Sequence, residues 1–305
     1  MQAPDEFNPQ AGLAEELEPG LRRILAPNPS PMTYRGTNTY VIGTGGLAVI
    51  DPGPESEPHL AAILAAVQPD QRITHIIVTH SHLDHSPLSR ALAQATGAPV
   101  YAFGGPAAGR SAVMRQLAAD GLAGGGEGID TGFSPDITVG DGEMIRGDGW
   151  ELEVLHTPGH LGNHIALAWN DACFTADHVM GWASSLVSPP DGDLTDFMAS
   201  CRRLRQRSWR VFHPGHGAPI FDPAGRLDWL IAHRESREAA ILDVLLIAPA
   251  SAASLARQIY TETPPALLKA AERNVFAHLV DLTGRKLTAS QGVLSATAVF
   301  EQRGG

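Results

Sequence analysis

The run His80-Ser81-His82-Leu83-Asp84-His85 places three imidazoles and one carboxylate within a single short segment. Two histidines separated by one residue can reach the same metal ion when the backbone is extended or forms a tight loop. Asp84 and His85 follow at once and point elsewhere, so a second ion can lie beside the first. Imidazole and carboxylate ligands without thiolate suit Zn²⁺, and also Mn²⁺ or Fe²⁺. The run therefore predicts a metal site with room for two divalent ions.

Three further segments place a potential ligand at the end of a predicted strand: Thr157-Pro158-Gly159-His160, Phe174-Thr175-Ala176-Asp177 and His213-Pro214-Gly215-His216. Proline and glycine permit tight turns that aim a side chain outward from the strand end. A lone histidine is more often structural than a ligand. Several such segments in one chain nevertheless favour a shared site.

Asp51, in the segment Asp51-Pro52-Gly53, allows two interpretations. Its carboxylate, at a strand end, can accept a proton from a ligand imidazole and orient it. The same three residues also suit a plain turn. The sequence alone leaves both interpretations open.

The elements that position these residues follow from the pattern of apolar residues. A β-branched strand at Ile73–Thr79 ends where the histidine run begins. We expect further strands at Leu21–Leu25, Asn38–Ile42, Leu47–Ile50, Ala98–Ala102 and Trp209–Phe212, with short strands recurring from Ile137 to Thr175. We expect helices at Glu57–Val67, Ser86–Thr96 and Asp193–Arg207. Residues 103–136 are rich in glycine and alanine, and we expect a flexible excursion with one helix, Ser111–Ala119.

The pattern changes after Pro223. Three predicted helices and a small hairpin make a winged-helix-like unit: Leu227–Leu246, Ala252–Tyr260, Ala266–Leu282, and the strands Arg285–Ala289 and Ser295–Gln302. We therefore divide the chain into a catalytic part, residues 1–225, and a C-terminal module, residues 226–305. The C-terminal module has nine basic and eight acidic residues, whereas the catalytic part has thirteen basic and twenty-five acidic ones.

Composition narrows the class of protein. The chain has 305 residues, a formal net charge of −11 and only two cysteines, Cys173 and Cys201. That count argues against a disulfide framework and excludes a four-cysteine zinc site. No apolar run approaches the ~20 residues of a membrane span, and no signal-peptide pattern is found, so we expect a cytoplasmic protein with no membrane partner. The acidity argues against a large polyanionic ligand.

The order of these residues resembles the metallo-β-lactamase superfamily over about Leu21 to Pro219. The segments Asn28–Thr33 and Gly36–Tyr40 and the C-terminal module look like the lactamase-beta-like branch that includes a mitochondrial endoribonuclease. The resemblance implies a four-layer αββα sandwich of the α/β (α+β) class with the site at one edge. It implies that His80, His82 and His160 hold one metal, that Asp84, His85 and His216 hold a second, and that Asp177 bridges them. The chain departs from the family at Ala176, where many members have glycine.

Such a ligand set predicts a binuclear hydrolase in which a metal-bridging hydroxide attacks a carbonyl carbon or phosphorus. Asp84, His164 and His178 are the catalytic candidates, the two histidines as general acids. We expect a small ester, thioester or lactone as substrate, with Trp182, Ser184 and Ser185 lining the cleft. The alternatives are an endoribonuclease acting on single-stranded RNA, and a mononuclear iron thiol oxygenase or inactive binding relative. We expect the C-terminal module to narrow the cleft or form a homodimer.

Overall fold

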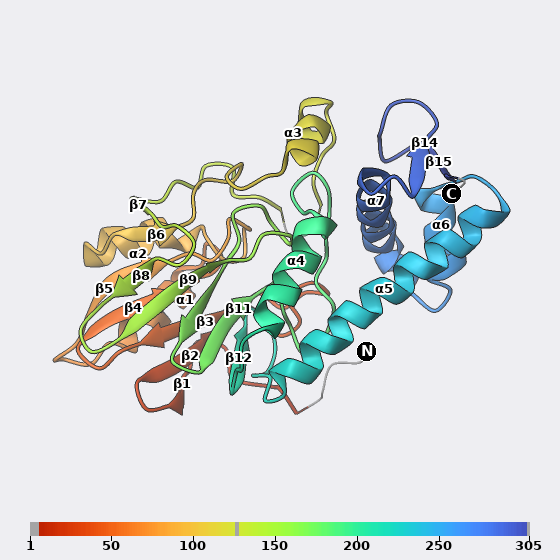
Figure 1. Ribbon diagram of the computed structural model, residues 1–305. Coiled ribbons are helices and arrows are strands. Elements are labelled where there is room, and N and C mark those ends of the chain that lie inside the picture. Colours follow the sequence, from red (N-terminus) through yellow and green to blue (C-terminus); the bar gives the residue numbers. More distant parts are fainter. Residues whose placement is uncertain (1–5, 126–127, 304–305) are drawn as a thin grey trace.

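The computed structural model describes residues 6–125 and 128–303 (Figure 1). Two β-sheets lie face to face, helices cover their outer sides, and a helical unit with a small sheet of its own stands beside them. Within the described residues, no helix combines the length and apolar character that crossing a membrane requires.

The first sheet has seven strands in the order β1-β2-β3-β4-β5-β6-β7. Pairing is antiparallel from β1 to β4 and parallel from β4 to β7. The strands are β1 (Ala14–Glu18), β2 (Leu21–Leu25), β3 (Asn38–Ile42), β4 (Gly46–Ile50), β5 (Arg72–Ile77), β6 (Val100–Ala102) and β7 (Ile137–Thr138). Every residue of β3 and β4 is buried, as expected for strands covered on both faces. The acidic strand β1, which the sequence did not indicate, forms a hairpin with β2.

The second sheet has five strands in the order β12-β11-β10-β9-β8. They are β8 (Met144–Arg146), β9 (Glu151–His156), β10 (Ile165–Trp169), β11 (Ala172–Ala176) and β12 (Val211–Pro214). Only the pair β11–β12 is parallel, because helix α4 (Leu194–Arg205) connects these two strands. The side chain of Asp193 caps this helix by accepting from the Thr195 backbone N–H.

Three apolar cores define the four layers of the catalytic part. Ile50, Leu152 and Leu167 belong to the core between the two sheets. The helices α1 (Glu57–Ala65) and α2 (Leu88–Thr96) cover the outer face of the first sheet. Helix α4 covers the second sheet through a core that includes Phe197. The expected αββα sandwich is confirmed.

The C-terminal module contains α6 (Ala252–Ile259), a 3₁₀ turn η1 (Pro265–Leu267) and α7 (Leu268–Gly284) beside a three-stranded sheet. Its strands are β13 (Ala250–Ser251), β14 (Thr288–Ser290) and β15 (Val299–Gln302), in the order β13-β15-β14. The predicted winged-helix arrangement is confirmed. The sequence missed the two-residue strand β13, and it placed the start of the hairpin's first strand three residues too early.

Helix α5 (Pro223–Ile247) joins the two parts of the chain. Leu227 and Leu230, near its start, pack in the core under the second sheet, whereas Ile241 and Leu245 belong to the core of the C-terminal module. The predicted division at residue 225 falls within the first turn of this shared helix.

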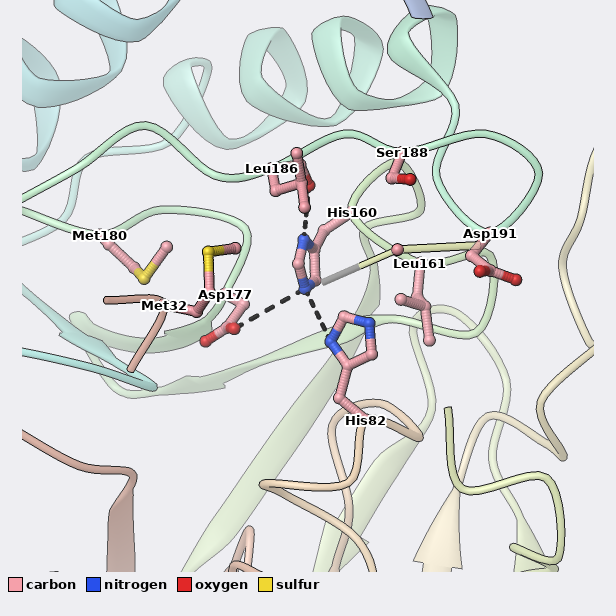
Figure 2. A pocket seen from close by; sticks show the side chains of 10 residues that line it. Met32, His82, His160, Leu161, Asp177, Met180, Leu186, Ser188 and Asp191 are labelled. Atoms are coloured by element: carbon pink, nitrogen blue, oxygen red, sulfur yellow. Dashed lines mark hydrogen bonds and ion pairs between the residues drawn. The ribbon is translucent and has the colours of Figure 1, made fainter. Parts of the chain in front are cut away.

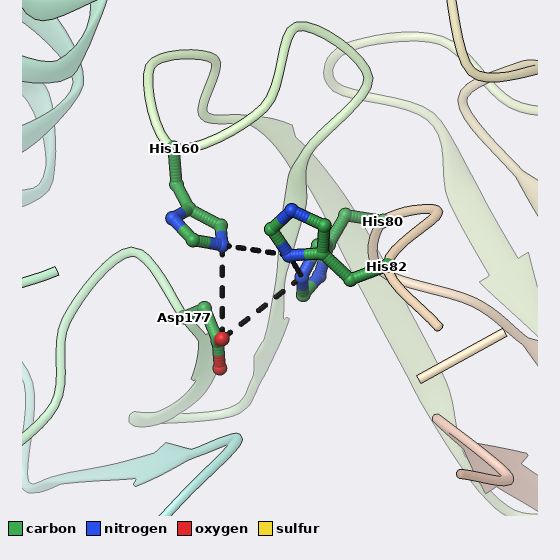
Figure 3. A group of neighbouring side chains, drawn as sticks. All are labelled: His80, His82, His160 and Asp177. Atoms are coloured by element: carbon green, nitrogen blue, oxygen red, sulfur yellow. Dashed lines mark hydrogen bonds and ion pairs between the residues drawn. The ribbon is translucent and has the colours of Figure 1, made fainter. Parts of the chain in front are cut away.

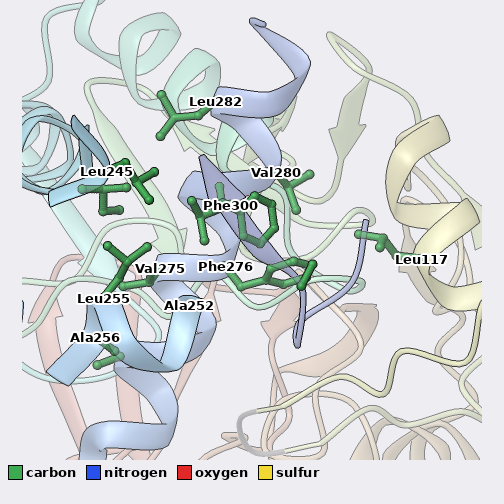
Figure 4. Packing of buried hydrophobic residues seen from close by; sticks show 14 of the residues in the cluster. Leu117, Leu245, Ala252, Leu255, Ala256, Val275, Phe276, Val280, Leu282 and Phe300 are labelled. Atoms are coloured by element: carbon green, nitrogen blue, oxygen red, sulfur yellow. The ribbon is translucent and has the colours of Figure 1, made fainter. Parts of the chain in front are cut away.

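Helix α3 (Ala112–Ala119) also connects the two parts. Met114 and Leu117 of α3 are buried in the same core as Phe276 and Phe300 of the C-terminal module (Figure 4). The expectation of a flexible excursion was therefore wrong for α3, because two apolar side chains one helical turn apart are buried in the core of the C-terminal module.

Candidate metal centre

The histidine run follows β5 and folds into a tight turn. The backbone N–H groups of His85 and Ser86 both donate to the carbonyl of His82, at 3.1 Å each. This turn directs the ligand side chains of the run into the interior, where His80 is 1% and His85 0% exposed. Burial on this scale requires partners for the polar atoms.

The first donor group consists of His80, His82, His160 and Asp177 (Figure 3). His82 Nδ1 lies 3.0 Å from His80 Nε2 and 3.1 Å from His160 Nε2. Asp177 Oδ2 lies 3.6 Å from His160 Nε2 and 4.0 Å from His80 Nε2. The donors of a tetrahedral zinc ion with bonds of 2.0–2.1 Å are about 3.3 Å apart, so this spacing suits one metal ion.

The second donor group consists of Asp84, His85, His216 and, again, Asp177. Asp84 Oδ2 lies 3.1 Å from His216 Nε2 and 3.3 Å from His85 Nε2. Asp177 contributes Oδ1, 3.5 Å from His85 Nε2, and Oδ2, 3.3 Å from His216 Nε2. The structure thus brings all seven predicted ligands together, with Asp177 common to both groups.

The chemistry of these donors also fits bound cations. Among the described residues, His85 Nε2, Asp84 Oδ1 and Asp177 Oδ1 are buried and have no hydrogen-bond partner. A buried polar atom without a partner is energetically costly. Of these three atoms, His85 Nε2 lies in the second donor group, and the two oxygens belong to carboxylates of the donor groups. Two divalent ions would satisfy them.

The ligands come from both sheets. The histidine run follows β5 of the first sheet, whereas His160 lies between β9 and β10, Asp177 directly follows β11, and His216 follows β12. Ala176, at the end of β11, has φ +42°, in the left-handed region that favours glycine. The departure from the family pattern at Ala176 therefore coincides with a strained backbone immediately before the shared ligand.

Neighbouring groups hold the outer nitrogens of the ligand imidazoles. His160 Nδ1 donates to the Leu186 carbonyl at 2.9 Å, and His216 Nδ1 donates to the Gly36 carbonyl at 3.1 Å. Such contacts fix the ring orientation and leave Nε2 free for a metal. Because both acceptors are backbone carbonyls, no side-chain type in the sequence indicated them.

Asp51 holds His85 in the same way. Its Oδ2 accepts from His85 Nδ1 at 2.9 Å, and its carboxylate also accepts from the backbone N–H and the hydroxyl of Thr79, each at 2.7 Å. Of the two interpretations of Asp51, these contacts favour the one in which its carboxylate orients a ligand.

The candidate ligands differ in the pKa of their imidazoles, as His82 and His216 illustrate. Burial lowers the pKa of His82 to about 3, so this ring is neutral and ready to bind a metal. For His216, burial acts to lower the pKa, but Asp177 and Asp84 outweigh it and raise the pKa to about 10. His216 therefore carries a proton when no cation is bound. Metal binding at the second group must release that proton.

His164 and His178 lie behind the ligands. Burial lowers the pKa of both. His164 Nδ1 is 2.9 Å from Thr157 Oγ1, and its ring centroid is 5.1 Å from that of His80. His178 packs on Phe197, with ring centroids 4.4 Å apart. A general-acid role for either ring stays a prediction, and this placement does not favour it, because neither is among the described residues that line the pocket over the metal site.

The loop between Asp177 and α4 is fixed from the C-terminal side. The Ser185 hydroxyl donates to the Asp177 carbonyl, and the Ser185 carbonyl accepts from the buried guanidinium of Arg234 in α5. Asn274 Oδ1 in α7 accepts from the Val187 N–H at 3.1 Å and from Arg234 Nη1 at 2.9 Å. These contacts, which sequence reasoning missed, reach the shared ligand and the Leu186 carbonyl that orients His160.

A pocket opens over the first donor group (Figure 2). His82, His160 and Asp177 form its floor, and apolar side chains surround them; we call it the metal pocket. Its described lining residues are Met32, His82, Gly125, His160, Leu161, Asp177, Met180, Leu186, Ser188 and Asp191. None of them is Lys or Arg. Of the expected cleft residues, Trp182 and Ser184 line an adjoining groove, whereas Ser185 is fully buried.

Comparison with known families agrees with this geometry. Residues 32–216 match the model of the metallo-beta-lactamase superfamily, and residues 251–293 match that of the beta-lactamase associated winged helix domain. The chain therefore belongs to the metallo-β-lactamase superfamily.

Among curated proteins, the chain is 32% identical over 275 residues to a beta-lactamase-like protein 2 homolog of Drosophila melanogaster, covering 85% of this chain and 86% of that one. It is 29% identical over 238 residues to an atrochrysone carboxyl ACP thioesterase of Claviceps purpurea, covering 77% and 68%. Among solved structures, a beta-lactamase domain protein from Burkholderia ambifaria has a similar fold, with a TM-score of 0.81 at 20% identity, covering 98% and 96%.

Proposed function

We propose that this protein is a two-metal hydrolase of small thioesters or other carboxylic esters. The observation that carries the proposal is the pair of donor groups that share Asp177 beneath a pocket with mostly apolar walls. Divalent ions held there would lower the pKa of a water molecule and polarise the carbonyl oxygen of the substrate. The likeness to proteins named thioesterases supports a carbonyl substrate.

The residues of the chain have distinct parts in this proposal. His80, His82 and His160 would hold one ion and Asp84, His85 and His216 the other, and Asp177, which is common to both donor groups, would contribute to each. Asp84 remains the candidate proton acceptor of this proposal, because its carboxylate lies in the second donor group beside His85 and His216. Asp51 and the Leu186 carbonyl keep two of the imidazoles in the orientation that binding requires.

RNA cleavage is less well supported. Binding of nucleic acid depends on Lys and Arg that neutralise phosphates. The described lining of the metal pocket contains neither residue, and two carboxylates, Asp177 and Asp191, face it.

The test uses the purified full chain loaded with zinc, manganese or iron. We expect two ions per chain by elemental analysis, hydrolysis of a phenyl thioester or ester, and loss of hydrolysis with EDTA or in the variant His82→Ala. Ala65→Phe, on the exposed face of α1, is the control and should behave as the wild type. A single iron per chain would contradict the two-metal site. Cleavage of single-stranded RNA with no turnover of any ester would overturn the choice of substrate.

A further inference from the structure

An apolar groove continues from the metal pocket towards the C-terminal module. It shares Met32, Met180 and Leu186 with the metal pocket and has a volume of about 210 Å³. Its far wall is formed by Tyr260, Leu267, Ala270 and Ala271, which belong to α6, η1 and α7 or follow them directly. The shared residues show that the groove directly adjoins the metal pocket, so we infer that a molecule whose reactive bond lies over the candidate ligands extends into this groove.

The described side chains that line the groove carry no charge. Its described lining residues include no Asp, Glu, Lys, Arg or His, and the polar ones are Trp182, Ser184, Tyr260, Thr263 and Asn274. The Asn274 side-chain oxygen is already occupied by Val187 and Arg234. Such a wall offers an occupant little beyond apolar contact, so it selects for apolar surface.

On the other side, the metal pocket shares Gly125 and Asp191 with a wider, open cleft. Unlike the groove, this cleft has charged side chains in its described lining, because Asp191 and Arg110 form an ion pair there. The metal pocket therefore lies between a groove whose described lining has no charged side chain and an open cleft that carries an ion pair.

We propose that the groove binds the apolar acyl group of a thioester or ester, while the open cleft on the other side receives the alcohol or thiol part. The proposal rests on the hydrolase function above and deepens it by naming the part of the substrate that is selected. In the reaction, water adds its oxygen to the acyl carbon and the bond from that carbon to sulfur or oxygen breaks. One proton of the water passes to the leaving thiol or alcohol and the other is released to solvent, while the apolar chain of the carboxylate product lies in the groove.

The experiment compares p-nitrophenyl acetate, butyrate, hexanoate and octanoate on the metal-loaded full chain. The leaving group is constant, so kcat/KM reports on the acyl group. Burial of a methylene contributes roughly 0.8 kcal/mol, which corresponds to about a fourfold increase per methylene while the groove has room. A profile that is flat or falls from acetate to octanoate overturns the proposal.

Two variants change the groove in opposite directions. Ala270→Phe places a ring in it and should lower the octanoate-to-acetate ratio of kcat/KM about tenfold, while Ala65→Phe on α1 leaves that ratio unchanged. Leu267→Ala lengthens the groove and should move the optimum to a longer chain, an outcome that a folding defect cannot produce. Unchanged ratios in both groove variants contradict the proposal.

A binding measurement separates this proposal from the proposed function. Isothermal titration with octanoate and acetate should give at least tenfold tighter binding of octanoate to the metal-loaded chain, and Ala270→Phe should remove that preference. If no ester is hydrolysed, the hydrolase function fails, but a preference for octanoate still supports an apolar site. If esters are hydrolysed and octanoate binds no better than acetate, the groove proposal fails alone.

Discussion

Replacing Asn274 with alanine should weaken metal binding although Asn274 belongs to the C-terminal module and touches no ligand. Its side-chain oxygen accepts from the Val187 N–H and from Arg234 Nη1. Through these two donors it holds the loop whose Leu186 carbonyl orients His160 and whose Ser185 hydroxyl contacts the Asp177 backbone. The variant therefore loosens one ligand of the first group and the ligand shared by both.

The magnitude follows from the two lost hydrogen bonds. An amide left without an acceptor costs about 1–3 kcal/mol, and a charged donor costs more. Because Asn274 is only partly buried, water offsets some of the loss, and we expect the free energy of unfolding of the metal-free protein to fall by about 2–3 kcal/mol. Loss of a contact that orients a ligand weakens metal binding by about 10–100-fold. Competition with a chromophoric chelator measures this affinity, and urea denaturation measures stability.

Asn274→Asp is the matched control. It keeps the acceptor oxygen and places a carboxylate beside Arg234, a buried guanidinium held here by an amide and a carbonyl rather than by an anion. We expect stability equal to or above that of the wild type, with metal affinity retained. If Asn274→Ala loses stability but binds metal as tightly as the wild type, the C-terminal module does not support the metal site. Equal damage from alanine and aspartate would also refute the reasoning.

Further predictions concern the metal site and its backbone. Asp51→Asn removes the charge that holds His85 Nδ1. Chelator competition should show about 10–100-fold weaker binding of the second ion, while the circular dichroism spectrum stays unchanged. Unaltered metal affinity would mean that Asp51 serves only to form the turn. Adding zinc at about a thousandfold over its Kd should stabilise the protein by about 4 kcal/mol, visible as a higher Tm that EDTA reverses; a Tm indifferent to EDTA would argue against a metal that bridges the two sheets. Ala176→Gly should raise the free energy of unfolding in urea by about 1 kcal/mol because it relieves the positive φ; a decrease would speak against strain there. Burial lowers the pKa of His59 to about 4, so between pH 6.5 and 4 the unfolded chain binds a proton that the folded chain does not, and stability falls as the pH falls through this window. His59→Gln should therefore reduce the loss of stability between pH 7 and 5 in metal-free protein by about 2 kcal/mol. An identical pH dependence of the two proteins in urea would show that folding does not lower the pKa of His59.

The sequence indicated the seven candidate ligands that the structure brings together because they stand next to strong local signals. The run from His80 to His85 follows a β-branched strand, and Asp177 and His216 follow short apolar strands with turn residues beside them. These strands belong to two different sheets, so local patterns located the candidate ligands, but the packing of the sheets is what brings them together. The αββα architecture was predicted from the family resemblance.

The contacts around the ligands were beyond prediction for a physical reason. The Leu186 and Gly36 carbonyls carry no side-chain signature, and Arg234 and Asn274 reach the site only through the packing of α5 and α7. The burial of α3 was missed because the glycine- and alanine-rich composition around it outweighed two apolar residues, Met114 and Leu117. The apolar groove combines segments far apart in the chain, and only the folded structure brings Met32 and Ala270 to the same cavity.

All seven candidate ligands precede Gly217, whereas the far wall of the apolar groove begins at Tyr260. Under the proposed function, the residues that hold the ions are therefore encoded apart from one wall of the groove, although Met32, Met180 and Leu186 of the catalytic part also line it. Recombination that grafts a different C-terminal segment would then change that wall, and with it the preferred acyl group, while the candidate ligands stay the same. A graft must still supply the guanidinium of Arg234 and the amide of Asn274, and it must match the apolar cores that α5 and α7 share with the catalytic part.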